Sequence, residues 1–142
     1  AGCESVAIHV EAPDQHRATL DAIRDSGGRA GLAIDPETPI ESLASLRDEL
    51  DFALVMTVKS GFGGQSYRAE AAGRMAAIRT LIGERDGHPL PLHVDGGINP
   101  TTAGDAAAAG ADLLVVGSAL FSAQGPTGMG GAVRAIRESA TR

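Results

Sequence analysis

The chain has 142 residues and a formal net charge of −6, from 12 lysines and arginines against 18 aspartates and glutamates. This length suits one domain, and 43% hydrophobic with 21% charged residues is typical of a globular rather than a disordered chain. The acidic balance argues against nucleic acid or an anionic membrane as a partner, and no apolar stretch is long enough to span a membrane. The lone cysteine, Cys3, favours a reducing, cytoplasmic compartment, and we expect it to be a small buried side chain.

Five short apolar runs, bounded by Gly, Pro or Asp, predict strands that are buried on both faces. They cover residues 5–10, 30–34, 52–58, 90–94 and 113–116. Apolar residues at helical spacing alternate with these runs and predict helices over 16–26, 41–50, 69–82, 100–109 and 129–140. Strands that alternate with helices predict a parallel sheet with right-handed crossovers, in one domain over residues 1–142.

Glycines mark the predicted helix ends. Gly27 and Gly110 each stand between a helix and the next strand, where a left-handed backbone conformation ends a helix. The chain opens Ala1-Gly2 and passes directly into a strand, which is the same pattern. We therefore expect the sequence to start inside a fold, with a helix before residue 1.

Glycine-rich turns follow three consecutive predicted strands. They are Gly61-Phe62-Gly63-Gly64, Asp95-Gly96-Gly97 and Gly117-Ser118. Ligands of parallel α/β folds bind beyond the carboxyl ends of the strands, and glycine lets an anion approach backbone N–H groups closely. One such turn is explained by chain reversal alone, whereas three side by side predict a phosphate site.

Asp95 ends a predicted strand and is the candidate catalytic residue. Alternation along the strand places it on the same face as His93. In a barrel this face points inward, so Asp95 would lie at the mouth and His93 one layer deeper, as a packed and hydrogen-bonded side chain. The alternative is an aspartate that caps the following helix.

Residues 55–67, with Gly-Phe-Gly-Gly-Gln at their centre, resemble the sixth-strand signature of ribulose-phosphate 3-epimerases. Residues 94–98 resemble the seventh strand of that family and residues 116–121 the eighth, while 8–12 and 35–39 are similar to the fourth and fifth. The similarity runs in order from residue 1 to about 122. It implies an α/β fold of the (β/α)8 TIM-barrel family, here an incomplete barrel of about five βα units and the C-terminal part of such an enzyme.

The resemblance also implies the chemistry. These enzymes interconvert D-ribulose 5-phosphate and D-xylulose 5-phosphate through an enediolate, by moving the C3 proton from one face of the substrate to the other. Two aspartates act as base and acid and, with two histidines, hold a divalent metal ion such as zinc, iron, manganese or cobalt. Asp95 matches one aspartate, as catalytic residue, substrate contact and metal ligand. Further substrate and phosphate contacts are implied at Gly61, Phe62, Gly63, Gly64, Gly96, Gly97, Gly117, Ser118 and Met56.

The chain departs from the family pattern in several places. The other aspartate and both metal-binding histidines belong to strands that this chain lacks, and none of its four histidines matches them. We therefore expect the remaining ligands upstream and residues 1–142 alone to be inactive. Lys59-Ser60 stands where the family has a residue followed by Pro, which predicts a looser start of the glycine loop. Asp35 replaces a common Asn and adds negative charge near the rim.

Two other functions stay open. One is a phosphate-binding module without catalysis, and the other is an epimerase of another ketose phosphate, such as a ketohexose 6-phosphate. In each case the partner is a sugar phosphate rather than nucleic acid or a membrane. We expect the full-length enzyme to be a homo-oligomer.

Overall fold

A computed structural model describes residues 2–13, 15–68, 70–123 and 128–141. Its main feature is a sheet of five parallel strands, in the order β1 (Ser5–His9), β2 (Arg29–Ile34), β3 (Phe52–Met56), β6 (Leu92–Asp95) and β7 (Leu113–Val115). Sheet order follows chain order, and β1 and β7 remain the two edges of this described sheet. The predicted strands and their parallel arrangement are confirmed.

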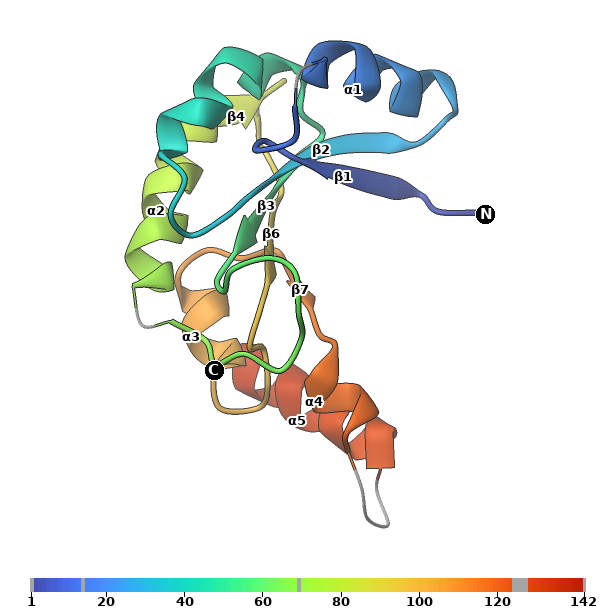
Figure 1. The fold of residues 1–142 in the computed structure, drawn as a ribbon. Coiled ribbons are helices and arrows are strands. Elements are labelled where there is room, and N and C mark those ends of the chain that lie inside the picture. The colour runs from blue at the N-terminus through green and yellow to red at the C-terminus, as the bar shows by residue number, and fades with distance from the viewer. Residues whose placement is uncertain (1, 14, 69, 124–127, 142) are drawn as a thin grey trace.

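A helical segment follows each strand: α1 (His16–Asp25), the 3₁₀ helix η1 (Ile40–Glu49), α2 (Ala71–Ile82), α3 (Ala103–Ala108), and α4 (Ser118–Phe121) with α5 (Gly128–Ala140). Figure 1 shows α1, α2, α3 and α5 along one side of the sheet, so its other side is left open within the described part of the chain. Ala69, the predicted start of one helix, lies outside the described residues. No helix among those described is long and apolar enough to cross a membrane.

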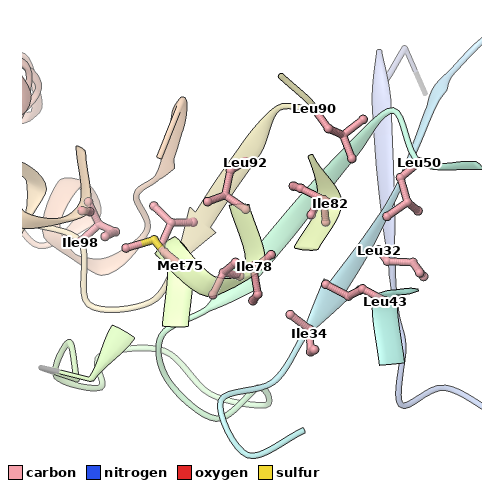
Figure 2. Packing of buried hydrophobic residues seen from close by; sticks show 14 of the residues in the cluster. Leu32, Ile34, Leu43, Leu50, Met75, Ile78, Ile82, Leu90, Leu92 and Ile98 are labelled. Atoms are coloured by element: carbon pink, nitrogen blue, oxygen red, sulfur yellow. The ribbon is translucent and has the colours of Figure 1, made fainter. Parts of the chain in front are cut away.

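The core lies between the sheet and the helices. Alternate strand residues face the helices, and Figure 2 shows them packed against apolar side chains of η1 and α2. Fully buried members of this cluster are Leu32, Ile34, Leu43, Leu50, Val55, Met75, Ile78, Leu92 and Val94. Burial of each such side chain contributes about 1.5–3 kcal/mol. This packing fixes the strands whose carboxyl ends carry the glycine turns.

The opposite face of the sheet is filled at its centre by a pair of rings. Phe52 stacks on His93 with ring centroids 4.3 Å apart, and a Cβ on Gly31 would lie 2.5 Å from the Phe52 ring. The prediction of a packed His93 is confirmed. No hydrogen bond to its ring is found among the described residues, so stacking on Phe52 replaces the hydrogen bond that we expected. Burial, and then the positive charge of Arg29, lowers the pKa of His93, which favours the neutral ring.

The helix that we predicted over 41–50 is a 3₁₀ helix, η1, which begins at Ile40 and ends at Glu49. Its inward-facing residues Ile40, Leu43 and Leu46 recur every third position. A 3₁₀ helix has three residues per turn, so this spacing stacks them along one edge.

A short hairpin, β4 (Glu84–Arg85) with β5 (His88–Pro89), was not predicted. Asp86 and Gly87 both have positive φ, 55° and 76°, as a two-residue hairpin turn requires. The hairpin lies between α2 and β6 and leaves the order of the parallel strands unchanged.

The helix α3 begins at Ala103, three residues later than predicted. The side chain of Asn99 accepts a hydrogen bond from the Thr101 N–H at 2.8 Å, and Thr102 Oγ1 accepts one from the Asn99 N–H at 3.0 Å. These local bonds replace the first helical turn.

Three predictions concern single residues near helix ends or the start of the chain. Gly27 and Gly110 have φ of 85° and 97°, which confirms the left-handed helix ends. The expectation of a buried Cys3 is wrong, because this side chain is exposed. It precedes β1, which pairs on one side only, so no neighbouring strand covers it.

Candidate active site

The carboxyl ends of β3, β6 and β7 bring three side chains into one row. Met56 pairs with Asp95 in the sheet register, and Asp95 pairs with Val115. Side chains at paired positions of neighbouring strands share a face, so all three lie on the face away from the core helices. The sheet thus presents one carboxylate between two apolar side chains at its carboxyl edge.

A pocket of about 460 Å³ opens beside this row, walled by the turns that follow β3, β6 and β7. These turns lie in the lower half of Figure 1. All ten residues that we predicted for the site line this pocket: Met56, Gly61, Phe62, Gly63, Gly64, Asp95, Gly96, Gly97, Gly117 and Ser118. The fold therefore gathers three glycine turns that are far apart in the chain.

Four other pocket residues with polar side chains were not predicted for the site: His9, Lys59, Ser60 and Gln65. The last three flank the glycines in the sequence, so their position beside the turn was a signal that could have found them. His9 ends β1 and lies in the pocket wall. No motif beside His9 in the sequence indicated that this residue lines the pocket.

Asp95 is the only carboxylate among the described residues that line the pocket. It is half-buried, and none of the described arginines, lysines or histidines forms an ion pair with it. Burial raises the pKa of Asp95, against the smaller opposing effect of a hydrogen bond from the Gly96 N–H. Residues 96–102 separate it from α3, so the alternative of a helix cap is excluded.

The glycines of the pocket fall into three groups, one of which, Gly61 and Gly64, has positive φ but no atom within 4 Å of an added Cβ. Gly96 and Gly97 are packed: a Cβ on Gly96 would lie 2.6 Å from Thr57 Oγ1, and one on Gly97 would lie 2.8 Å from the Tyr67 Cα. Both also have positive φ. A Cβ on Gly63 or Gly117 would meet no atom within 4 Å and neither has a positive φ. Chain packing therefore explains glycine at 96 and 97, whereas it leaves Gly63 and Gly117 free for another role, such as close approach of a ligand.

His9, Glu11 and Asp35 form a polar group at the edge of the pocket. Their potential ligand atoms all lie within 4.8 Å of one another, so they could hold a cation. The same atoms are already in contact, since His9 Nδ1 lies 3.2 Å from Glu11 Oε2 and 3.9 Å from Asp35 Oδ1. Burial raises the pKa of Glu11, but hydrogen bonds, first from Thr38 and from the Asp35 N–H, outweigh it and hold this pKa below its usual value.

A divalent cation fits Asp95 on chemical grounds. A half-buried carboxylate with a raised pKa and no ion-pair partner among the described side chains lacks the positive charge that would offset its burial. Sites for catalytic divalent metals have three or four protein ligands, and in this pocket Asp95 supplies a single carboxylate. The described residues are therefore consistent with one ligand of such a site.

Solved structures with the same architecture include two synthases. The 3-hexulose-6-phosphate synthase of Salmonella typhimurium superposes with a TM-score of 0.71 and 19% identity, over 99% of this chain and 63% of that one. A Mycobacterium tuberculosis tryptophan synthase gives 0.66 and 21%, over 96% and 50%. These similarities show the fold alone, and they confirm the incomplete TIM barrel.

Sequence relatives agree with one another in name. The chain is 43% identical over 144 residues to the ribulose-phosphate 3-epimerase of Rhodobacter capsulatus, covering 99% of this chain and 61% of the relative. It is 40% identical over 121 residues to that of Escherichia coli K12, covering 85% and 53%. The chain thus spans between half and two thirds of the length of these relatives. The model of the ribulose-phosphate 3 epimerase family matches residues 1–121, and with these identities it shows that the chain belongs to the ribulose-phosphate 3-epimerase family.

Proposed function

We propose that the protein interconverts D-ribulose 5-phosphate and D-xylulose 5-phosphate by proton transfer at C3. The observation that carries this proposal is the place of Asp95, the one carboxylate that the described residues supply to a pocket whose walls are three glycine turns. The turns supply backbone N–H groups for a phosphate, and the carboxylate supplies an acid–base group for the sugar. Membership of the epimerase family gives the type of reaction.

Four pocket residues have a stated role in this proposal. Asp95 takes up or returns the proton at C3, and its raised pKa brings the protonated form closer to working pH. The N–H groups at Gly63 and Gly117 hold the phosphate, because the open space beside their Cα atoms lets an anion approach. Met56, paired with Asp95 in the register, keeps water from the reacting carbons.

Asp95 would also hold a divalent cation, such as zinc, iron, manganese or cobalt. When bound, such an ion stabilises the negative charge that develops on the substrate oxygens. Among the described residues the pocket offers one carboxylate, whereas epimerisation needs a proton donor on the second face of the substrate. We therefore expect a polypeptide of these residues alone to be inactive. A cytoplasmic location and a homo-oligomeric state also stay predictions.

The test follows exchange of the C3 proton with D₂O by NMR, using the complete protein and D-ribulose 5-phosphate. Asp95→Asn should lower the exchange rate about 10²–10⁴-fold, the usual contribution of a general acid–base group. Asp48→Asn is the matched control, since the Asp48 side chain is 89% exposed and does not line the pocket. Its exchange rate should equal that of the wild type.

Three outcomes separate the functions. The proposal is supported if the wild type exchanges the C3 proton of D-ribulose 5-phosphate and Asp95→Asn lowers that exchange rate by about 10²–10⁴-fold. Binding of the sugar phosphate without exchange, in the wild type, would identify a phosphate-binding module instead. Faster exchange with a ketohexose 6-phosphate than with D-ribulose 5-phosphate would move the assignment to an epimerase of that sugar.

A further inference from the structure

The start of the glycine loop is tied to the end of the neighbouring strand β2. Asp35 follows β2, and Ser60 precedes the glycines that follow β3. The Ser60 N–H donates to Asp35 Oδ1 at 3.2 Å, and the Ser60 hydroxyl donates to Asp35 Oδ2 at 2.9 Å. The N–H and the hydroxyl of Ser60 therefore each donate to a different oxygen of the Asp35 carboxylate.

These are two of the positions at which the sequence departs from the pattern that the resemblance implies, with Asp in place of Asn and Ser in place of Pro. A proline at 60 would have no N–H to donate and no hydroxyl. Two hydrogen bonds hold Ser60 where a proline ring would restrict the backbone, and the expectation of a looser loop start stays a prediction.

The backbone N–H and carbonyl oxygen of Asp35 also form hydrogen bonds, which hold this residue in place. Its N–H donates to Glu11 Oε1 at 2.9 Å, and its carbonyl oxygen accepts a hydrogen bond from Arg74 Nη2 at 2.8 Å. The same Arg74 nitrogen also donates to the Thr38 carbonyl oxygen at 2.5 Å. Glu11, in the turn after β1, and Arg74 of α2 thus fix the position of Asp35, which binds Ser60.

A second restraint closes the loop on its far side. The Gln65 side chain donates from Nε2 to the carbonyl oxygens of Lys59 and Phe62, at 2.7 and 2.9 Å. Gly61 and Gly64 have positive φ, and glycine has no side chain to limit its backbone. The conformation of residues 61–64 therefore depends on these restraints from outside.

We propose that Asp35 is a positioning residue that, by binding Ser60, sets the backbone of the glycine loop (residues 61–64) for the phosphate group of the substrate. Asp35 does not line the pocket, so it acts through Ser60, which does. A cation held by His9, Glu11 and Asp35 is the competing explanation. Anchoring is favoured because both Asp35 oxygens and one Glu11 oxygen already accept hydrogen bonds from protein donors. The effect on substrate rests on the proposed function, whereas the effect on the loop does not.

The experiment combines amide hydrogen exchange of residues 60–64 with steady-state kinetics on the complete protein. Asp35→Ala should raise exchange of these amides roughly tenfold, and should raise KM for D-ribulose 5-phosphate roughly tenfold with a smaller change in kcat. Asp35→Asn should recover part of both losses, because its amide oxygen can still accept from the Ser60 N–H. Ser60→Ala, which keeps that N–H, should give an intermediate effect, and the double variant Asp35→Ala with Ser60→Ala should resemble Asp35→Ala alone. Asp48→Ala is the control for loss of a carboxylate.

Each outcome decides the matter. Unchanged exchange of residues 60–64 in Asp35→Ala, or strictly additive effects in the double variant, would overturn the anchor while leaving the proposed function intact. Faster loop exchange in a protein without epimerase activity would support the anchor and reject the function.

Calorimetry with Mn²⁺ alone tests the competing explanation, a cation held by His9, Glu11 and Asp35. One equivalent beyond the ion held at Asp95, bound by the wild type and by Ser60→Ala but not by Asp35→Asn, would replace the anchor with a cation site.

Discussion

Thr57 and Asp95 are joined across the boundary between β3 and β6. The Thr57 N–H donates to the Asp95 carbonyl oxygen at 2.8 Å, and the Thr57 hydroxyl lies within hydrogen-bond distance of the carbonyl oxygens of Asp95 (3.1 Å) and Gly96. Thr57 is 1% exposed, so its hydroxyl has no water to replace these partners. One buried side chain thus fixes the backbone that carries the candidate catalytic carboxylate.

Replacing Thr57 by Val should lower both stability and activity. The change keeps the shape of the side chain and removes its hydroxyl, so the free energy of unfolding should fall by about 1 kcal/mol. The turn at Asp95 and Gly96 loses a restraint, and kcat should fall more than KM rises. Thr57→Ser restores the donor and should recover most of kcat. Urea unfolding and kinetics on the complete protein measure the two effects, and equal kcat values for the Val and Ser variants would contradict this role.

Asp95 should destabilise the fold at neutral pH. Burial raises the pKa of Asp95 above its ordinary value, so the folded state binds a proton more tightly than the unfolded state. The free energy of unfolding should therefore fall as pH rises from the unfolded pKa through the folded pKa. Asp95→Asn removes this effect and should raise Tm at pH 7 but leave it unchanged near pH 3. Thermal unfolding with a chelator present measures this, and equal shifts at both pH values would rule out ionisation of Asp95 as the cause.

Gly117→Ala tests the glycine turn after β7. A Cβ at this position meets no atom within 4 Å. The backbone angles, φ −104° and ψ −95°, lie outside the regions that alanine prefers, so the Tm of the variant is measured together with its binding. Calorimetry with D-ribulose 5-phosphate should show binding weakened roughly tenfold or more, because the added methyl group lengthens hydrogen bonds to the phosphate. Gly73→Ala is the control, since Gly73 is an exposed residue of α2 with equally open space.

A comparison of Gly117→Ala with Gly97→Ala separates an effect on ligand binding from an effect on packing. Gly97→Ala places a methyl group against the Tyr67 backbone and should lower Tm, so its loss of binding carries no information about phosphate. Unchanged affinity in Gly117→Ala would show that the turn after β7 does not contact the ligand.

Most of the sheet could be predicted from the sequence, because each strand is a short apolar run with a glycine, proline or aspartate beside it. The type of helix over 41–50 could not be assigned, since Leu43 and Leu46 fit three residues per turn as well as 3.6. The hairpin at 84–89 left a usable signal, the Asp86-Gly87 pair, but its strands are too short to form an apolar pattern.

The candidate site was predictable where it consists of local motifs. Glycine turns and Asp95 are read directly from consecutive residues, and parallel strands bring their carboxyl ends together. The contact of Asp35 with Ser60 joins positions 25 residues apart, and nothing in the local pattern of either predicts it. Such a contact depends on the order of β2 and β3 in the sheet and on rotamers that periodicity does not describe.

A polypeptide of residues 1–142 expressed by itself should self-associate through its sheet edges. Strands β1 and β7 each pair on one side only in the described sheet, which leaves N–H and C=O groups unpaired along both. Val6 of β1 and Leu113 of β7 are 40% and 45% exposed, so each edge also presents an apolar side chain. Unpaired backbone groups beside apolar side chains are what edge-to-edge association requires.

Charged substitutions on these edges should reverse the association. A variant with Val6→Lys and Leu113→Lys places a charge on each edge, which disfavours pairing with another strand. Met129→Lys is the control, because Met129 is 47% exposed but lies on α5, away from the strand edges. Light scattering during size exclusion should show concentration-dependent oligomers for the unmodified polypeptide and for Met129→Lys, and a smaller species for the double edge variant. A monomer in the unmodified polypeptide, or equal relief by Met129→Lys, would show that the edges of the sheet do not drive the association.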